Sequence, residues 1–209
     1  MNDLDCMPQI KEFVRWAHKV GKYELVRCSS GNLSCRMTDD TILVSESRSW
    51  LSNLKRKQVV QVSINDGSII KGNRPTGELP LHLAIMRRNP GINAILHCQS
   101  TSATTIACLP NQDINYNVII EVPIYIGKIQ HIPYMKPGSQ DLGDAVAQAT
   151  DSATIVQMQN HGQVVIGNSL EDVVQKAVFF ELACNIMLNS KFNYTAINSE
   201  QINLLQGYR

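Results

Sequence analysis

The sequence lacks the features that direct a chain to a membrane or to nucleic acid. No stretch approaches the roughly 18 apolar residues that a membrane-spanning helix needs, and no apolar run follows a basic start as in a secretory leader. Lysine and arginine total 19 against 18 aspartates and glutamates. The one basic triplet, Lys55-Arg56-Lys57, is interpreted as a solvated turn. We therefore expect neither a membrane nor a nucleic-acid partner.

Cysteine pairs typical of zinc ribbons and redox sites are also missing. None of the six cysteines has a second one at C-x-x-C spacing. A chain of 209 residues, 44% of them hydrophobic, can bury a core without disulfides. We expect a cytoplasmic protein whose cysteines pack mostly as small apolar residues.

Helical and strand-like patterns alternate along the chain. Asn65-Asp66-Gly67 between two apolar runs predicts a hairpin, and Asn168 with Glu171 forms a capping-box pattern before a long helix. No linker divides the chain, so we expect a single domain over residues 1–209, with one sheet covered by helices. Periodicity predicts helices over 8–20, 78–88, 104–109 and 138–149, strands over 41–44, 59–64, 68–70, 92–97, 118–120, 124–126, 154–158 and 164–166, and a polar loop over 29–34.

A few polar residues have the spacing and chemistry of a metal site. His97 and Gln99 point to the same face of a strand. His161 precedes a glycine in a tight turn, and Glu78 opens a predicted helix. Two histidines, an amide and a carboxylate can hold zinc and leave a position for substrate. A histidine at a strand end is also commonly a hydrogen-bonded structural residue, so spacing alone leaves both interpretations open.

Five short segments occur together in an order and spacing that resemble the class II aldolase/adducin family. The resemblance extends from about residue 8 to residue 190. It implies a three-layer α/β/α fold with a mostly antiparallel central sheet, and a homotetramer with sites between subunits. The segments are Ser30-Gly31-Asn32-Leu33-Ser34, Pro75-Thr76-Gly77-Glu78 with His82, Asn93-Ala94-Ile95-Leu96-His97, Ile132-Pro133-Tyr134 with Pro137-Gly138-Ser139, and Asn160-His161-Gly162.

The resemblance also implies roles for individual residues. The positions of the family's zinc ligands fall on His97, Gln99 and His161, and its acid/base carboxylate falls on Glu78. The carboxylate moves a proton on the substrate while the metal polarises the neighbouring carbonyl. The positions implied to bind substrate phosphate are Gly31, Asn32, Ser47, Arg48, Thr76 and Gly77.

The sequence departs from the family pattern at four places. Gln99 replaces a histidine, and a neutral amide is a poorer zinc ligand than imidazole. Glu78 could therefore serve as a metal ligand in place of that histidine. Gly77 removes a phosphate-binding hydroxyl. Arg48 could bind a phosphate or a carboxylate through two hydrogen bonds, or its side chain could face solvent. The family's catalytic tyrosine, which a neighbouring subunit supplies, aligns near Ile119, with Tyr116 close by. Outside these positions, His82 is interpreted as a structural histidine.

We therefore expect an aldehyde-lyase that carries out retro-aldol cleavage of a small sugar phosphate or related carbonyl compound with a divalent metal, zinc by preference. Glu78, His97 and His161 favour this function. Gln99, Gly77 and Ile119 favour the alternative, an adducin-like module that binds or oligomerises without catalysis. A third possibility is an epimerase or dehydratase of the same family.

Overall fold

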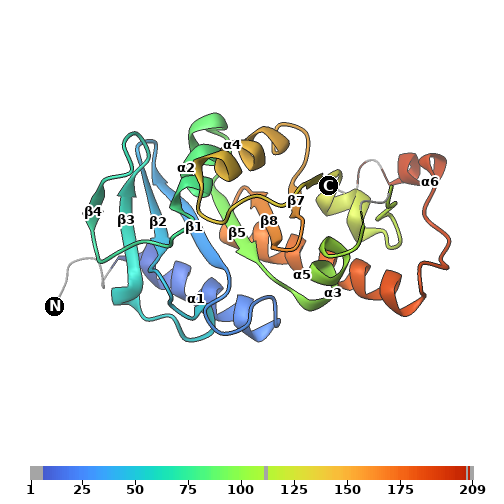
Figure 1. The fold of residues 1–209 in the computed structure, drawn as a ribbon, viewed down its shortest axis with the longest axis horizontal. Coiled ribbons are helices and arrows are strands. Elements are labelled where there is room, and N and C mark those ends of the chain that lie inside the picture. Colours follow the sequence, from blue (N-terminus) through green and yellow to red (C-terminus); the bar gives the residue numbers. More distant parts are fainter. Residues whose placement is uncertain (1–6, 111–112, 206, 208–209) are drawn as a thin grey trace.

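A single eight-stranded sheet forms the centre of the molecule, with its strands in the order β4-β3-β2-β1-β5-β8-β7-β6. The computed structural model describes residues 7–110, 113–205 and 207, and Figure 1 shows the arrangement. The strands are β1 (Asn32–Thr38), β2 (Thr41–Ser45), β3 (Val59–Ser63), β4 (Ile69–Lys71), β5 (Ala94–Cys98), β6 (Ile129–Ile132), β7 (Ile155–Met158) and β8 (Gly162–Gly167). The helices are α1 (Pro8–Lys22), α2 (Leu79–Arg88), α3 (Thr101–Ala107), α4 (Gln140–Ala149), α5 (Leu170–Asn189) and α6 (Ser199–Leu204), with short 3-10 turns η2 (Leu51–Asn53) and η3 (Arg56–Gln58) and a π-helical turn η4 (Val122–Ile126).

Strand pairing is antiparallel throughout except at one edge. The last strand, β6, runs parallel to β7, with Ile129 opposite Ile155 and Ile132 opposite Met158. The predicted hairpin is present, since β3 and β4 pair on either side of the Asp66-Gly67 turn. The expected helix-covered, mostly antiparallel sheet is confirmed, with the parallel edge pair making it a mixed sheet.

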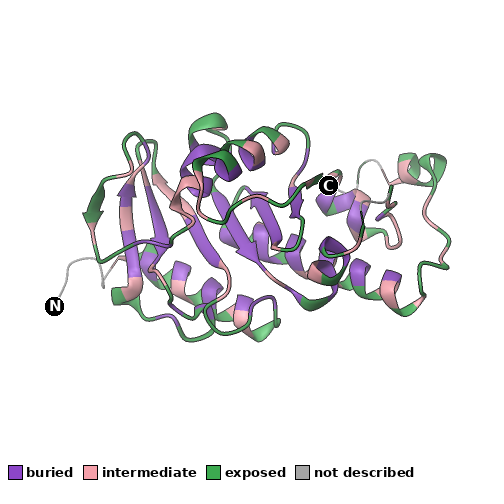
Figure 2. Cartoon of the chain, in the orientation of Figure 1, coloured by how far each residue is buried: buried purple, intermediate pink, exposed green. Residues whose placement is uncertain are grey.

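Helices cover both faces of the sheet and enclose two separate apolar cores. On one face, α1, α3 and α5 pack over Leu33, Leu43 and Leu96. On the other, α2 and α4 pack over residues such as Ile42 and Ile95. Alternate residues of one strand point to opposite faces of the sheet and so pack into different cores. Figure 2 shows that the central strands are buried. Burying both faces of the sheet gives the three layers.

Three local predictions were wrong. Residues 118–120 and 124–126 are not strands, because they form a turn and η4; Pro123 has no backbone N–H for a sheet hydrogen bond. The strand on that side of the sheet is β6, a few residues later. The polar segment 29–34 is only partly a loop, since β1 begins at Asn32. The segment lacks the apolar alternation that predicts a strand, because its polar side chains face the candidate site rather than an apolar core.

The long predicted helix is α5, and its cap lies one residue from the predicted position. Ser169, not Asn168, is the N-cap, and the Ser169 side chain accepts a hydrogen bond from the backbone N–H of Asp172. A hydroxyl at this position satisfies one of the free amides of the first turn. Within the described ranges, no helix is long and apolar enough to cross a membrane.

Candidate metal centre

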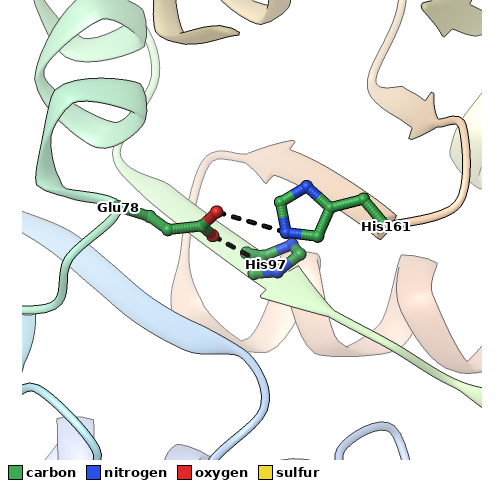
Figure 3. A group of neighbouring side chains, drawn as sticks. All are labelled: Glu78, His97 and His161. Carbon is green, nitrogen blue, oxygen red and sulfur yellow. Dashed lines mark ion pairs between the residues drawn. The ribbon is translucent and has the colours of Figure 1, made fainter. Parts of the chain in front are cut away.

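Three segments that are distant in sequence bring Glu78, His97 and His161 together (Figure 3). Glu78 is the N-cap residue of α2. His97 lies in β5, on the same face as Ile95 and therefore under α2 and α4. His161 lies in the turn between β7 and β8, and β8 pairs with β5. The pairing of β5 with β8 places this turn beside His97.

The three side chains form a compact group of donor atoms. Glu78 Oε2 lies 3.3 Å from His97 Nε2, and Glu78 Oε1 lies 3.2 Å from His161 Nε2. One ligand atom from each residue falls within 4.8 Å of the others. His97 is only 2% exposed, and the side chains of Glu78 and His161 are partly buried, at 13% and 11% exposed. Nitrogen and oxygen atoms at these separations can converge on one divalent ion.

The protonation states of the group suit a metal. His97 Nδ1 lies 2.9 Å from the backbone carbonyl of Gln163. A carbonyl can only accept, so Nδ1 carries the proton and the Nε2 lone pair faces Glu78. Burial lowers the pKa of His97, although Glu78 opposes this effect. Burial alone would raise the pKa of Glu78, but His97, His161 and Asn32 outweigh it and lower the pKa to about 2.

Two buried atoms of the group have no hydrogen-bond partner among the described residues. They are Glu78 Oε1 and His161 Nδ1. The former is close to His161 Nε2 without making a hydrogen bond. A buried polar atom without a partner is costly, and a cation bound between the carboxylate and the imidazoles would relieve the cost at Glu78. The residues present therefore fit a divalent metal.

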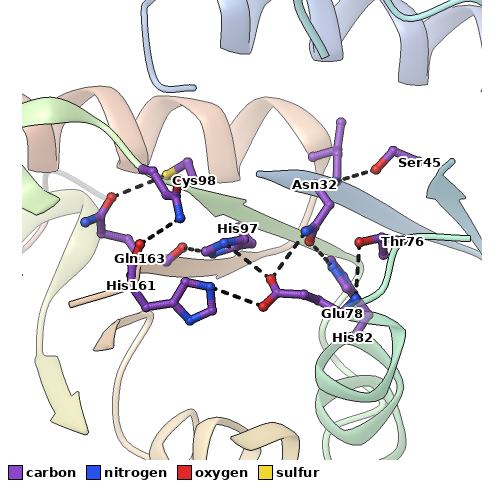
Figure 4. Close-up of polar contacts among 11 residues, drawn as sticks. Asn32, Ser45, Thr76, Glu78, His82, His97, Cys98, His161 and Gln163 are labelled. Atoms are coloured by element: carbon purple, nitrogen blue, oxygen red, sulfur yellow. Dashed lines mark hydrogen bonds and ion pairs between the residues drawn. The ribbon is translucent and has the colours of Figure 1, made fainter. Parts of the chain in front are cut away.

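A chain of hydrogen bonds connects Glu78 through Asn32 to His82 (Figure 4). The side-chain amide of Asn32 donates to Glu78 Oε2 over 3.3 Å, and its oxygen lies 2.5 Å from His82 Nε2. His82 Nδ1 lies 2.7 Å from Ser34 Oγ. His82 is fully buried and one helical turn from Glu78. The hydrogen bonds on both ring nitrogens agree with the interpretation of His82 as a structural histidine, and the structure adds its link to the acid/base residue through Asn32.

The turn that carries His161 requires glycine next to it. Gly162 has a φ of +151°, which side-chain-bearing residues rarely adopt. A Cβ there would meet the carbonyl oxygen of Cys98 at 2.5 Å and the Gln99 Cγ at 2.8 Å. The close approach of this turn to the end of β5 is what brings the two histidine rings within 4.9 Å, centroid to centroid.

Most of the predicted site residues line one cleft of about 230 Å³ around the Glu–His–His group. Ser47 is the exception and does not line it; its backbone N–H donates to Arg74 O. Gln99 lines the cleft with its amide nitrogen bonded to the carbonyl of His161 at 2.8 Å, so the structure shows it steadying the His161 turn, and metal ligation by Gln99 stays a prediction. The predicted residues that line the cleft are Gly31, Asn32, Arg48, Thr76, Gly77, Glu78, His97, Gln99 and His161.

The two candidates near the family's tyrosine position do not enter this cleft. Tyr116 is buried against Phe180, and its hydroxyl lies 3.0 Å from His131 Nε2. Ile119 is partly buried and packs against the core beneath α5. Neither residue lines the cleft of its own chain.

Comparison with known families fits this geometry. The family model described as Class II Aldolase and Adducin N-terminal domain matches residues 11–188, most of the chain. The chain belongs to this family. The resemblance inferred from the five sequence segments is thereby confirmed.

Two kinds of family member are similar in sequence. A 3-oxo-tetronate 4-phosphate decarboxylase of Haemophilus influenzae is 36% identical over 148 residues, covering 68% of this chain and 69% of that protein. An L-fuculose phosphate aldolase of Methanocaldococcus jannaschii is 32% identical over 178 residues, covering 85% and 94%. Among solved structures, YgbL of Escherichia coli superposes with a TM-score of 0.89 at 25% identity, over 95% of this chain and 98% of that one.

Proposed function

We propose that this family member is a metal-dependent lyase that cleaves a C–C bond beside a carbonyl group in a small phosphorylated sugar or sugar acid. The observation that carries the proposal is the group of Glu78, His97 and His161, which lines a polar cleft. Sites where several titratable groups converge and shift one another's pKa are usually functional. Aldolase-type retro-aldol cleavage is the first candidate reaction.

His97 and His161 would hold the ion, with Glu78 inside the same donor group. Zinc suits two imidazoles and a carboxylate. When bound, a divalent ion polarises a substrate carbonyl. Glu78 is ionised at neutral pH because its pKa is about 2, so it starts as a base that can accept a proton from a substrate hydroxyl. Asn32 orients that carboxylate through its hydrogen bond to Oε2.

Decarboxylation is the second candidate, favoured by the similarity to 3-oxo-tetronate 4-phosphate decarboxylases. The two reactions share one requirement, because each breaks a C–C bond and leaves its electron pair on carbon next to a carbonyl. In retro-aldol cleavage Glu78 would take the hydroxyl proton and return it to the carbanion. Loss of CO2 releases no proton from the substrate, so the proton that the carbanion takes up would have to come from solvent through Glu78.

The adducin-like, non-catalytic alternative is less well supported by the geometry. A degraded site has no reason to retain a buried carboxylate with an unpaired oxygen beside two imidazoles. We further propose that the protein acts as a cytoplasmic homotetramer. In a tetramer a neighbouring subunit would complete the cleft, which neither Tyr116 nor Ile119 lines within its own chain.

Elemental analysis followed by a paired assay tests the proposal. The untagged protein, purified without chelator, is expected to hold about one divalent metal per chain. L-Fuculose 1-phosphate is then assayed for aldehyde release and 3-oxo-tetronate 4-phosphate for CO2 release. Turnover of either substrate that disappears with chelator supports the lyase and identifies its branch. Absence of metal even after incubation with excess zinc would overturn it in favour of the non-catalytic alternative.

A further inference from the structure

The two histidines of the candidate centre differ in what holds their rings. The Nδ1 of His97 donates to the backbone carbonyl of Gln163 over 2.9 Å, and this bond sets the direction of its Nε2. His161 Nδ1 is buried and has no hydrogen-bond partner among the described residues. A histidine that binds a metal usually donates its second ring nitrogen to a carbonyl or a carboxylate. His161 lacks this support, so the position of its ring depends on its backbone.

Both backbone groups of His161 are hydrogen-bonded. Its N–H donates to the carbonyl of Met158 over 3.1 Å, within the turn between β7 and β8. Its carbonyl accepts the side-chain amide of Gln99 over 2.8 Å. The second bond joins residues 62 positions apart. It therefore connects the turn of His161 to the end of β5, the strand that carries His97.

Gln99 is itself fixed from two sides. The strand β5 ends at Cys98, and the backbone N–H of Gln99 donates to the carbonyl of Leu25 over 3.1 Å. Its side chain packs against the turn, since a Cβ added to Gly162 would lie 2.8 Å from the Gln99 Cγ. The alternation that predicts one shared face for His97 and Gln99 applies only within a strand, and Gln99 lies beyond the end of β5.

The chemistry of the amide also favours a hydrogen-bonding role over metal ligation. The amide nitrogen is a donor only, and the carbonyl of His161 already accepts from it. The amide oxygen is neutral and is a weaker zinc ligand than imidazole. Glu78 supplies a carboxylate beside both imidazoles. Two histidines and one carboxylate already make the three protein ligands of a catalytic zinc site with an open position.

We propose that Gln99 is a positioning residue that fixes His161 for metal binding through its backbone, and that Glu78, His97 and His161 bind the ion without a ligand from Gln99. The proposal rests on the proposed lyase function, because it assumes that this group binds a metal. Glutamine in place of the family's histidine then exchanges a ligand for a hydrogen-bond donor to the His161 turn. Three protein ligands leave positions on the ion for substrate oxygens.

Gln99→Leu separates the two roles, because leucine has neither an amide donor nor a ligand atom. Loss of a hydrogen bond to the turn destabilises the protein with or without metal, whereas loss of a ligand acts only when metal is bound. We expect Gln99→Leu to lower the Tm of the chelator-treated, full-length protein by about 2–4 °C. We expect its zinc affinity, measured by competition with a chromophoric chelator, to fall by about 10- to 100-fold.

Gln157→Leu is the matched control. The side-chain amide of Gln157 also donates to a backbone carbonyl, that of Ala103, over 2.9 Å. Gln157 is buried, and it alternates along β7 with Val156 and Met158, so it points to the face of the sheet that α3 covers. This variant should lower the Tm of the metal-free protein at least as much as Gln99→Leu. Its zinc affinity should stay within about 2-fold of that of the original protein, because an outer-shell effect on metal affinity requires contact with a ligand.

Three results would overturn the proposal while zinc binding by the original protein leaves the lyase proposal standing. An unchanged Tm of metal-free Gln99→Leu with weaker zinc binding would make Gln99 a ligand. Unchanged zinc affinity in Gln99→Leu, or an equal loss in Gln157→Leu, would make Gln99 purely structural. A crystal structure of the zinc-loaded original protein with Gln99 Oε1 about 2.0–2.2 Å from the ion would show ligation directly. If the original protein binds no zinc, the lyase proposal fails and this proposal fails with it.

Discussion

His82 Nε2 lies 2.5 Å from Asn32 Oδ1, and this contact fixes the direction of a buried chain that ends at Glu78. An amide oxygen can only accept, so His82 carries its proton on Nε2. Its Nδ1 then accepts the hydroxyl proton of Ser34. The amide nitrogen of Asn32 is left to point at the carboxylate. A residue predicted to bind phosphate thus positions the acid/base group.

Replacing His82 should reveal this chain through pH-dependent stability. His82→Leu leaves Asn32 Oδ1 and Ser34 Oγ without their hydrogen-bond partner. We therefore expect the free energy of unfolding to fall by about 2–4 kcal/mol at pH 8. Burial lowers the pKa of His82 from 6.5 to about 3, so the stability linked to its neutral form is present above pH 6.5 and is lost as the pH falls towards 3. The difference in the free energy of unfolding between the original protein and the variant should decrease by about 2 kcal/mol between pH 6.5 and 5.

Urea unfolding of chelator-treated protein at pH 8, 6.5 and 5 measures this difference. Ser34→Ala is the matched control, because it removes one partner and keeps the titrating ring. It should retain the pH dependence of the original protein. Parallel stability curves for the original protein and His82→Leu would show that the pKa of His82 is the same in the folded and unfolded states, and would contradict the lowered pKa.

Metal binding should depend on both histidines of the candidate centre. His97→Ala and His161→Ala each remove one nitrogen ligand of the Glu–His–His group, and we expect each to abolish stoichiometric metal. His131→Ala removes a histidine that contacts Tyr116 instead and should leave metal content unchanged. Elemental analysis of the three variants provides the readout. Full metal occupancy in both His97→Ala and His161→Ala would place the ion elsewhere.

Glu78→Gln should separate catalysis from binding. The glutamine oxygen can still accept the hydrogen bond from Asn32, so we expect the fold and the bound metal to persist. Loss of the base should lower turnover by about 10²- to 10⁴-fold. Metal content and far-ultraviolet circular dichroism serve as controls for the rate measurement. Undiminished turnover would remove Glu78 from its acid/base role.

Two glycines near the site should differ in how much an added methyl group destabilises the fold. At Gly162 a Cβ would collide with the carbonyl oxygen of Cys98 and approach His97 Cε1 at 3.4 Å, so Gly162→Ala should destabilise the fold by about 1–3 kcal/mol or more and weaken metal binding. At Gly77 nothing lies within 4 Å, and Gly77→Ala should stay within about 0.5 kcal/mol. Thermal unfolding compares the two. Equal effects would mean that the turn at Gly162 adjusts freely.

Local periodicity predicted most of the secondary structure, and it failed where a residue's surroundings are set by a distant segment. The 8–20 helix and the hairpin after Ser63 follow from apolar spacing and turn chemistry. The apolar run around Pro123 has strand composition but forms a π-helical turn. The strand that begins at Asn32 was missed because its polar residues pair with a buried histidine and carboxylate rather than with an apolar core.

The sequence by itself determined the family, the sheet covered by helices, and the identity of Glu78, His97 and His161 as a candidate group, because these depend on short motifs and on the order of patterned segments. Only the tertiary structure decided what those residues touch. The pairing of β5 with β8 and the start of α2 set the distances within the group, and the pairing of Asn32 with His97 across β1 and β5 turns Asn32 towards Glu78. Such contacts join residues separated by tens of positions, so no local pattern encodes them.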